Sequence, residues 1–219
     1  MYVKDKMSKE LQVAFAKMTI SEVLELIKDS DLHRLPVVDS KNNLIGLITK
    51  GSIKRDTKSS TLSVFELNYL FNSLKVEDVM IKGEDLHTIS PDALLEEAAS
   101  ILREYKVGCL PVVDNGNKVV GIITQNDIFD AFIDILGYHK DGTRYVIEIA
   151  EDKPGVLNAI SKCFLDINVS ISNLAVYNTE RGIELVAIAV GEGSDNCDDI
   201  LAKNGYKVTS KIRLQNKEA

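Results

Sequence analysis

The sequence lacks long apolar runs, an excess of basic charge and closely spaced cysteines. Its longest uninterrupted apolar run, residues 185–190, is far shorter than the roughly 20 residues that cross a bilayer, and residues 1–6 lack the apolar stretch of a secretory signal. A net charge of −7 disfavours a binder of nucleic acid or membranes. Cys109, Cys163 and Cys197 are too dispersed for a metal motif or a disulfide framework. We therefore expect a soluble, cytoplasmic protein without a metal site.

The 219 residues suffice for one large or two small domains, and a hydrophobic content of 45% allows a substantial core. Charge is distributed unevenly along the chain. Residues 1–75 contain 12 basic and 9 acidic side chains, residues 76–140 contain 5 and 12, and residues 141–219 contain 9 and 12. The acidic excess therefore lies mainly in the middle third, and the first third has a net charge of +3.

The strongest pattern is an internal repeat. The matched segments are residues 3–7 (VKDKM) with 76–80 (VEDVM), 35–39 (LPVVD) with 110–114 (LPVVD), and 46–49 (GLIT) with 121–124 (GIIT). The first pair is offset by 73 residues and the other two by 75. Three collinear matches indicate two copies of one unit.

Each copy has the pattern of a helix, a strand, a polar turn, a strand and a second helix. Thr19 and Glu22 have capping-box spacing at the start of the first helix of copy one, and residues 90–92 (SPD) are expected to open its counterpart. One copy has too little core to fold alone, so we expect the two to pack together. Between them, residues 62–74 predict a helix that is apolar nearly all round, which favours burial between the repeats or against a second chain.

Two copies of x-L-P-V-V-D followed by G-h-h-T-x-x-D, where h is apolar, resemble a tandem pair of CBS domains, also called a Bateman module. This resemblance implies a mixed α/β fold in which two βαββα-type repeats form a pseudo-twofold pair. The expected limits are 1–60 for the first repeat, 61–75 for the inter-repeat helix and 76–137 for the second repeat.

Beyond residue 137 the pattern changes. Residues 138–143 have the composition of a linker, residues 144–214 form a third unit, and 215–219 are a short tail. Within the third unit we expect strands at 144–150, 169–176, 183–190 and 206–213, and helices at 156–165 and 195–203. This is the βαββαβ order of the ferredoxin-like arrangement.

The third unit resembles an ACT domain in its run 152–157 (DKPGVL) and in residues 167–169 (INV). A CBS pair followed by an ACT domain resembles the acetoin-utilization B-type proteins of bacteria, and residues 66–70 (ELNYL) also fit that group. The resemblance implies a homodimer formed through the ACT domain.

Asp127 is the candidate ligand residue with the clearest chemistry. A carboxylate at a helix start can accept two hydrogen bonds from the 2′ and 3′ hydroxyls of a ribose, and the matching Asp of CBS domains does so. The alternative is an ordinary helix cap, because Asp is favoured at helix N-termini. The resemblance implies an adenosine site that comprises Thr88, Ile89, Val107, Gly108, Pro111, Thr124, Asn126 and Asp127.

The first copy departs from this motif. Thr49 is retained, but Ser52 stands where the second copy has Asp127, so the carboxylate is lost. We predict one competent site in the second repeat and a weak or empty site in the first. His33 and Arg34 precede the LPVVD strand, and the resemblance implies that this pair reaches across to the phosphates of the other site. The alternative is a solvated start of a strand.

The third unit contains a second candidate site. Pro154 and Gly155 form a turn ahead of a helix whose free N–H groups suit a carboxylate. The resemblance implies an amino-acid site formed by Asp152, Pro154, Gly155 and Val156, with Asn168 contributed across a subunit interface. The alternative is that Pro and Gly only shape the turn and that the domain serves to dimerise.

Our leading hypothesis is a regulatory sensor and not an enzyme, because three compact units occupy nearly the whole chain. Its CBS pair binds AMP, ADP, ATP or S-adenosylmethionine as a regulatory ligand and not as a catalytic cofactor. Its ACT domain dimerises, and whether it also binds an amino acid is left open between the two alternatives above. One alternative is a dimerising scaffold with empty pockets, in which Asp127 is only a cap. The other is a small enzyme that acts on a nucleotide.

Overall fold

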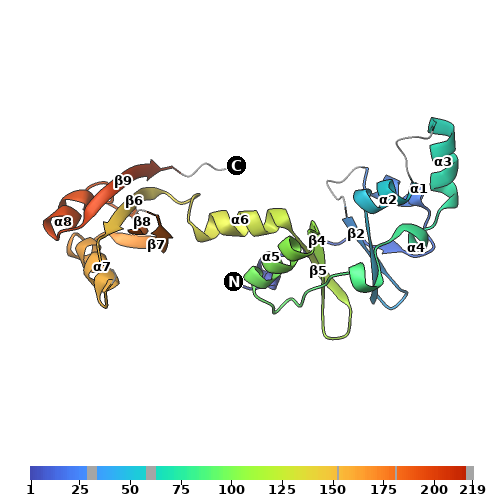
Figure 1. The fold of residues 1–219 in the computed structure, drawn as a ribbon, viewed down its shortest axis with the longest axis horizontal. Coiled ribbons are helices and arrows are strands. Elements are labelled where there is room, and N and C mark those ends of the chain that lie inside the picture. The colour runs from blue at the N-terminus through green and yellow to red at the C-terminus, as the bar shows by residue number, and fades with distance from the viewer. Residues whose placement is uncertain (29–33, 58–62, 152, 181, 216–219) are drawn as a thin grey trace. The chain divides into compact units, whose positions relative to one another are not determined.

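The structure is a computed structural model that describes residues 1–28, 34–57, 63–151, 153–180 and 182–215 (Figure 1). The chain divides into two compact units, Met1–Phe129 and Asp130–Ala219. Helix α6 (Gln125–Ile135) contains the boundary between them. Within the described ranges, no helix combines the length and apolarity that a membrane span needs.

The first repeat follows the predicted order of elements. It comprises η1 (Val3–Asp5), β1 (Ala14–Phe15), α1 (Ile20–Leu26), β2 (Arg34–Val38), β3 (Leu44–Thr49) and α2 (Lys50–Thr57). Strand β1 runs parallel to β2, and β2 runs antiparallel to β3. The predicted capping box of α1 is confirmed, because Glu22 N–H donates to Thr19 Oγ1 at 3.2 Å and the Glu22 carboxylate accepts from Thr19 N–H at 2.6 Å.

Helix α3 (Val64–Ser73) lies between the repeats in sequence, as predicted. It packs against α1 of the first repeat, and Phe71 and Leu74 reach the edge of that repeat's core. Phe65 and Tyr69 are 82% and 74% exposed, respectively. Among the described residues, only one edge of this helix reaches apolar partners. The expected burial between the repeats is therefore wrong, and burial against a second chain stays a prediction.

The second repeat comprises α4 (Val76–Val79), η2 (Gly83–Asp85), α5 (Leu95–Glu104), β4 (Cys109–Val113), β5 (Val119–Thr124) and α6. Cys109 pairs with Thr124 as Arg34 pairs with Thr49, so both hairpins have the same register. The prediction that residues 90–92 open α5 is wrong, since α5 begins at Leu95. The Ser90 hydroxyl instead accepts a hydrogen bond from the N–H of Asp92 within a preceding turn.

The two repeats exchange their first segments. Ser8 and Ile122 form two reciprocal backbone hydrogen bonds at 3.0 and 3.1 Å. The equivalent residues of the other copy, Ile81 and Leu47, form theirs at 2.8 and 2.9 Å. The short segment that begins each repeat therefore packs on the body of the other, and the sequence repeat alone did not reveal this exchange.

The hairpin tips also meet reciprocally. Asn42 Nδ2 donates to the Val119 carbonyl at 3.4 Å, and Asn117 Nδ2 donates to the Leu44 carbonyl at 3.0 Å. Both asparagines have positive φ, 64° and 60°, which Asn tolerates better than most residues. These paired contacts are those of a pseudo-twofold arrangement of the repeats.

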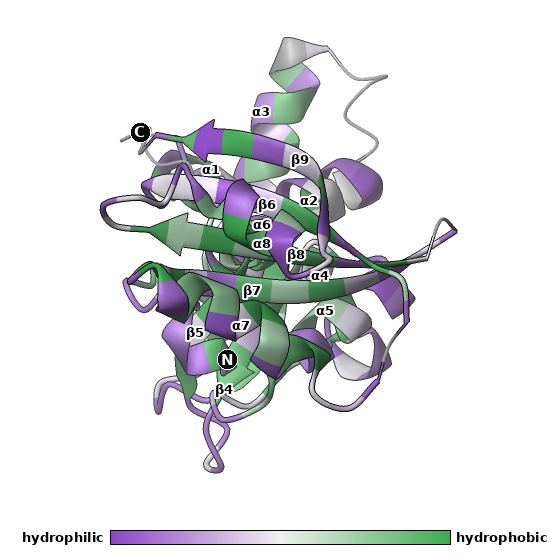
Figure 2. Ribbon diagram, turned by 90° about the vertical axis from the view of Figure 1, so that its left-hand side faces the viewer, coloured by the Kyte–Doolittle hydropathy of each residue, from purple (hydrophilic) through white to green (hydrophobic). Residues whose placement is uncertain are grey.

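The second unit has the predicted βαββαβ order. Its elements are β6 (Gly142–Ile149), α7 (Val156–Asp166), β7 (Ser170–Thr179), β8 (Gly182–Val190), α8 (Cys197–Lys203) and β9 (Lys207–Leu214). The antiparallel sheet has the strand order β7-β8-β6-β9. Central strand β8 is hydrophobic along most of its length, as Figure 2 shows.

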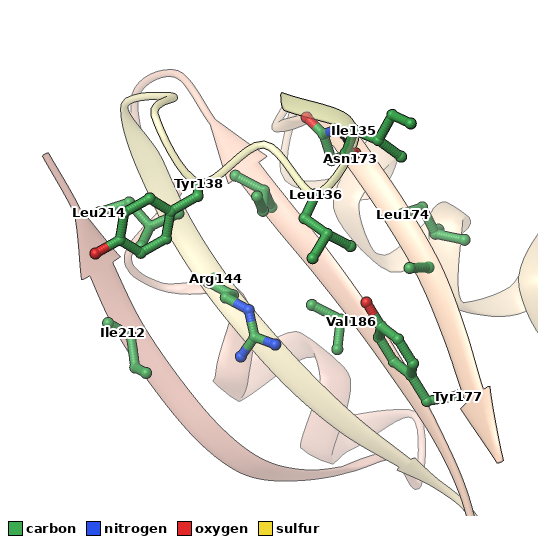
Figure 3. Close-up of a pocket in the computed structure, with 12 residues that line it drawn as sticks. Ile135, Leu136, Tyr138, Arg144, Asn173, Leu174, Tyr177, Val186, Ile212 and Leu214 are labelled. Carbon is green, nitrogen blue, oxygen red and sulfur yellow. Dashed lines mark hydrogen bonds between the residues drawn. The ribbon is translucent and has the colours of Figure 1, made fainter. Parts of the chain in front are cut away.

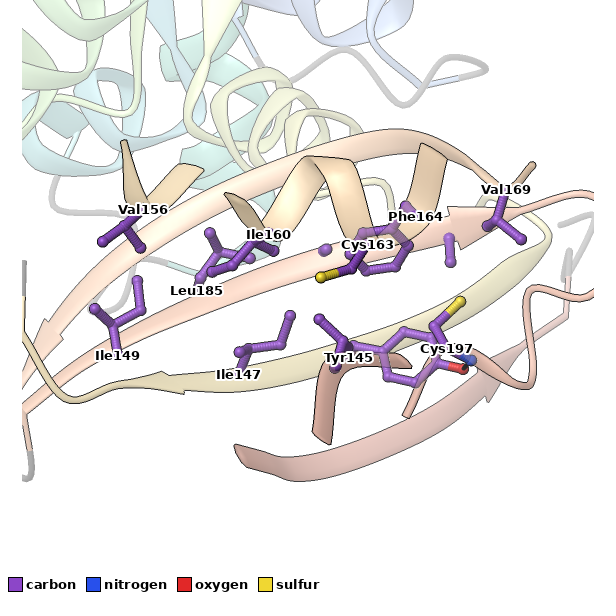
Figure 4. Packing of buried hydrophobic residues seen from close by; sticks show 13 residues of the cluster. Tyr145, Ile147, Ile149, Val156, Ile160, Cys163, Phe164, Val169, Leu185 and Cys197 are labelled. Atoms are coloured by element: carbon purple, nitrogen blue, oxygen red, sulfur yellow. Dashed lines mark hydrogen bonds between the residues drawn. The ribbon is translucent and has the colours of Figure 1, made fainter. Parts of the chain in front are cut away.

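One face of this sheet packs against α7 and forms the core of the unit (Figure 4). Helix α7 contributes Val156, Ile160 and Phe164, which face Tyr145 and other strand residues. The Tyr145 hydroxyl donates to the Ser194 carbonyl at 2.7 Å and accepts from Cys197 N–H at 3.2 Å. Burial raises the pKa of Tyr145, which keeps this hydroxyl protonated as a donor.

Candidate functional site

Asp127 forms a capping turn with Thr124 at the start of α6. The backbone N–H and the hydroxyl of Thr124 both donate to Asp127 Oδ2, at 2.7 and 2.8 Å. Both residues are half-buried, and Asn126 between them is exposed. Among the described residues, every hydrogen bond to this carboxylate goes to Oδ2. The cap therefore uses one carboxylate oxygen and leaves Oδ1 available to a ligand.

In the equivalent turn of the first repeat, the side chain of Ser52 bonds only to groups of Thr49 among the described residues. Thr49 N–H donates to Ser52 Oγ at 3.1 Å, and Ser52 Oγ donates to the Thr49 carbonyl at 3.0 Å. Ser52 N–H in turn donates to Thr49 Oγ1 at 2.9 Å. Ser52 is only 2% exposed. Its single hydroxyl thus both donates and accepts within its own turn.

A cavity of about 470 Å³ lies between the two repeats of the first unit. One wall comes from the first repeat and includes Arg34, Thr49 and Ser52. The other wall comes from the second repeat and includes residues 106–109 and His87. Of the residues predicted to bind nucleotide, the cavity brings together Arg34, Thr49, Ser52, Val107 and Gly108.

The cavity is basic although the second repeat is acidic. Among the described residues, its lining contains four cationic side chains and one carboxylate, namely Arg34, Lys50, Arg55, Lys106 and Asp85. A cation-rich lining favours an anionic ligand, and arginine can bind phosphate or carboxylate through two hydrogen bonds. Across the described ranges, no group of three or more His, Cys, Asp or Glu side chains could hold a metal ion.

Arg34 reaches from the first repeat to the backbone of the second. A Cβ atom at Gly108 would lie 2.6 Å from Nη2 of Arg34, so the glycine permits this approach. The Gly108 carbonyl accepts a hydrogen bond from Gln125 N–H at 3.3 Å, at the first residue of α6. Arg34 therefore contacts the residue whose carbonyl anchors the start of the helix that carries Asp127.

Cys109 lies beside Gly108 in the wall of the cavity. It occupies the repeat position of Arg34, 75 residues on. Burial raises the pKa of the Cys109 thiol to about 11, and the nearby Arg34 acts in the opposite direction. The thiol therefore stays protonated and contributes no negative charge to the cavity.

The remaining predicted adenosine residues are not in the described lining of this cavity. Thr124, Asn126 and Asp127 lie at the end of β5 and the start of α6, and the other three lie in β4 or beside it. Ile89 N–H donates to the Pro111 carbonyl at 3.1 Å, and both residues are buried. Thr88 is half-buried next to them. His33 lies outside the described residues. The repeat offset maps residues 106–108 onto 31–33, so the counterpart of this wall on the Asp127 side also lies outside them.

Sequence reasoning missed His87 and Lys106 as lining residues. His87 stacks on Tyr105 with ring centroids 3.7 Å apart, and Lys106 follows the end of α5 with a positive φ of 53°. Nothing in the local sequence distinguishes His87, because the three histidines of the chain are widely separated. The repeat contained a signal for Lys106. At the offset of 75 residues, Lys106 corresponds to Asp31 of the first copy, so the second copy has a basic residue where the first has an acidic one.

In the second unit, the predicted turn lies at the start of α7. Gly155 has a φ of 97°, and Pro154, Gly155 and Val156 line a surface cavity of about 660 Å³. Asp152 lies outside the described residues. Asn168 follows the other end of α7, which at 11 residues is about 16 Å long. One chain therefore does not bring Asn168 to this turn.

Comparisons with known proteins address the first unit. The CBS domain family profile matches residues 3–56 and 76–134. A CBS domain-containing protein of Dictyostelium discoideum is 33% identical over 135 residues, which cover 61% of this chain and 92% of that protein. Inosine-5′-monophosphate dehydrogenase of Haemophilus influenzae is 36% identical over 110 residues, which cover 50% of this chain but only 20% of the enzyme.

Three solved structures share this fold. CBSX2 of Arabidopsis thaliana in complex with AMP is 28% identical, with 61% of this chain and 97% of that chain covered and a TM-score of 0.52. A CBS domain pair in complex with 5′-methylthioadenosine and S-adenosyl-L-methionine is 27% identical, with coverages of 60% and 99% and a TM-score of 0.51. A protein assigned to acetoin utilization in Vibrio cholerae is 26% identical, with coverages of 63% and 95% and a TM-score of 0.53. Because the family profile matches both repeats, and with them more than half of the sequence, this chain belongs to the CBS domain family and contains a tandem CBS pair.

Proposed function

We propose that this protein is a regulatory sensor whose CBS pair binds an adenosyl compound, such as AMP, ADP, ATP or S-adenosylmethionine. Two structurally similar CBS pairs support the ligand class, since one is in complex with AMP and the other with 5′-methylthioadenosine and S-adenosyl-L-methionine. The ligand acts as a signal in this proposal, and the protein does not convert it.

The observation that carries the proposal is the contact of Arg34 with Gly108, whose carbonyl accepts from Gln125 at the start of α6. Asp127 would accept the ribose hydroxyls, with Oδ1 as the oxygen that the cap does not use. Arg34 would bind the anionic end of the ligand from the other repeat. His33 is a second proposed donor that rests on the sequence alone. Thr49 and Ser52 would form the weak site.

A ligand held by both repeats would favour one relative orientation of them. The shift is limited by the difference in affinity for the two orientations. Because each repeat's first segment packs on the other repeat, a change in their orientation also acts on the backbone pairs Ser8–Ile122 and Leu47–Ile81. This gives the sensor a physical output within the CBS pair.

Thermal unfolding of the full chain with AMP, adenosine, 5′-methylthioadenosine and S-adenosylmethionine tests the proposal. A ligand at about 100 times its Kd should add about 2.7 kcal/mol of stability. We expect Arg34→Met to remove the effect of AMP and to retain that of adenosine, since only AMP has a phosphate. Lys41→Met, at the exposed tip of the first hairpin, is the matched control and should change neither.

Three outcomes would contradict the sensor. No stabilisation by any adenosyl compound would favour the dimerising scaffold, in which Asp127 only caps α6. Stabilisation that survives unchanged in Asp127→Ala would remove the proposed ribose contact. Turnover of a bound nucleotide would favour the enzyme alternative.

We further propose that residues 144–214 form an ACT domain that dimerises and binds an amino acid at the Pro154–Gly155 turn. The βαββαβ order, the strand order β7-β8-β6-β9 and the cavity at the start of α7 support this. The first N–H groups of α7 have no partner within the helix and suit a carboxylate. Asn168 would come from a second copy.

Light scattering and amino-acid titration test this second proposal. We expect a dimer, and we expect Gly155→Val and Asn168→Ala each to abolish binding. An equal mixture of the two variants should regain binding in mixed dimers, because one interface then has both native residues. A monomer would contradict the proposal, and a dimer that binds no amino acid would leave dimerisation as the only role.

A further inference from the structure

The second unit contains an apolar cavity on the face of its sheet that α7 does not cover (Figure 3). Its volume is about 350 Å³, at the lower end of the range for small-molecule sites. Val186 and Ile188 line it and alternate along β8 with the core residues Leu185 and Ala187. The segment that follows α6 covers the cavity with Leu136 and Tyr138.

Of the described residues that line this cavity, Arg144 alone is charged. It is half-buried, and in Figure 3 its guanidinium projects from β6 among apolar side chains. Among the described residues, the guanidinium forms no ion pair or hydrogen bond. A partly desolvated cation without a partner favours an anion, and a carboxylate matches its two parallel N–H groups.

The other polar side chains of the described lining, Asn173, Tyr138 and Tyr177, are an amide and two phenols and not carboxylates, which disfavours an ammonium group. Asn173 Nδ2 donates to the Ile135 carbonyl at 2.7 Å, and Asn173 Oδ1 accepts from the Ser172 hydroxyl at 3.1 Å. No carboxylate lines the cavity within the part of the chain that the structure describes. The α-ammonium of an amino acid would therefore lose its hydration without gaining a charged partner.

We propose that this cavity binds a small aliphatic monocarboxylate without an amino group. The carboxylate pairs with Arg144, and the hydrocarbon chain lies against Leu136, Val186 and Ile188. The site is distinct from the turn at Pro154 and Gly155, which lies at the start of α7 on the opposite face of the sheet. It does not depend on the adenosyl sensor or on the amino-acid site.

A matched series of six-carbon compounds tests the ligand class on the unmodified full chain. Calorimetric titration with hexanoate, hexan-1-ol, hexan-1-amine and norleucine varies the head group at constant chain length. We expect hexanoate to bind at least tenfold more tightly than hexan-1-ol, and the amine and norleucine to bind more weakly than the alcohol. Equal affinities for hexanoate and hexan-1-ol would overturn the proposal. A higher affinity for norleucine than for hexan-1-ol would also overturn it.

Three variants locate the site. Arg144→Met should weaken hexanoate at least tenfold and leave hexan-1-ol unchanged, whereas Ala175→Leu, which fills the cavity, should weaken both. Lys153→Met removes a cation at the turn before α7 and should change neither. Loss of hexanoate binding in Lys153→Met with retention in Arg144→Met would place the ligand at that turn and overturn the proposal. The ligand series on the unmodified chain decides the matter even if a variant fails to fold.

Discussion

Helices α2 and α6 begin with the same capping turn, but the turn ends on Ser52 in the first repeat and on Asp127 in the second. Ser52 caps α2 with one oxygen, which both donates and accepts within the turn. Asp127 also caps α6 with one oxygen, Oδ2. The comparison teaches that the cap requires a single acceptor, so a cap alone does not account for the second oxygen of Asp127.

A second difference lies at the start of the paired strands. Arg34 in the first repeat corresponds to Cys109 in the second, so one side supplies a guanidinium and the other a protonated thiol. The repeats thus share a backbone arrangement and differ in the side chains at the positions proposed to bind ligands. The proposed sensor needs a carboxylate for the ribose and a cation for the anionic end of the ligand. Of these two residues, Arg34 lines the cavity between the repeats, whereas Asp127 is not in its described lining.

The largest expected effect is on AMP affinity and comes from replacing Asp127 of the second turn with serine, the residue at the equivalent position of the first turn. Asp127→Ser should retain the cap of α6 and lose two charge-assisted hydrogen bonds to the ribose, each worth about 1.5 kcal/mol. We therefore expect AMP affinity to fall about 100-fold, as measured by calorimetry. Ser52→Ala is the control and should change AMP affinity less than twofold. Equal losses in both variants would show that the two turns are not functionally different.

The exchanged segments provide the next comparison. Gly46 lies under Met80, and Gly121 lies under Met7. A Cβ atom at either glycine would lie 3.1 Å from a backbone carbonyl oxygen of the exchanged segment. Gly46→Val and Gly121→Val should each lower the free energy of unfolding by about 1–3 kcal/mol through overpacking. Urea titration measures both, and a clearly smaller loss in Gly121→Val would show that the N-terminal segment packs less tightly than its counterpart.

A smaller effect on stability is expected from the N-terminal caps of the equivalent helices α1 and α5. Thr19 caps α1 with its side chain, whereas Leu94 at the same position of α5 cannot. Thr19→Ala should therefore destabilise the protein by about 1 kcal/mol. Leu94→Thr should stabilise it by about 0.5–1 kcal/mol, because Glu97 is already in place to complete a capping box. A loss of stability in Leu94→Thr would mean that the leucine, although 51% exposed, stabilises the fold more than the cap does.

Local patterns predicted much of this fold. The two hairpins and the βαββαβ order depend on alternation, turn residues and helical spacing within short windows, and the structure has them within a few residues. The repeat also indicated that Ser52 and Asp127 occupy equivalent positions. Residue identity at a helix start is visible in sequence, which is why Asp127 could be singled out before its surroundings were known.

Contacts between distant segments were not predictable in the same way. Nothing local in residues 3–8 indicates that they pack on the second repeat, because the exchange depends on how two copies meet. The exposure of Phe65 and Tyr69 depends on which edge of α3 reaches a core. The stacking of His87 on Tyr105 joins residues 18 positions apart, and no periodicity within either segment encodes it.

The smallest predicted effect distinguishes the two hairpin turns. Asp39 Oδ1 accepts from the N–H groups of Lys41 and Asn43, and Asp114 Oδ1 accepts from the equivalent two in its own turn. Only the first turn adds a side-chain donor, since Asn43 Nδ2 donates to Asp39 Oδ2 at 2.7 Å and the second repeat has Lys118 there. The backbone N–H and then the side-chain amide of Asn43 hold the pKa of Asp39 below its ordinary value of 3.8.

Because the pKa of Asp39 is lowered in the folded state, the charged turn stabilises the fold at pH values above 3.8. This contribution is lost as the pH falls through the lowered pKa. A carboxyl ¹³C titration should therefore give Asp39 a midpoint below 3.8. Asn43→Ala should raise that midpoint only part of the way to 3.8, since the backbone donors remain. An unchanged midpoint in this variant would show that the amide does not bind the carboxylate in solution, and the two turns would then be equivalent.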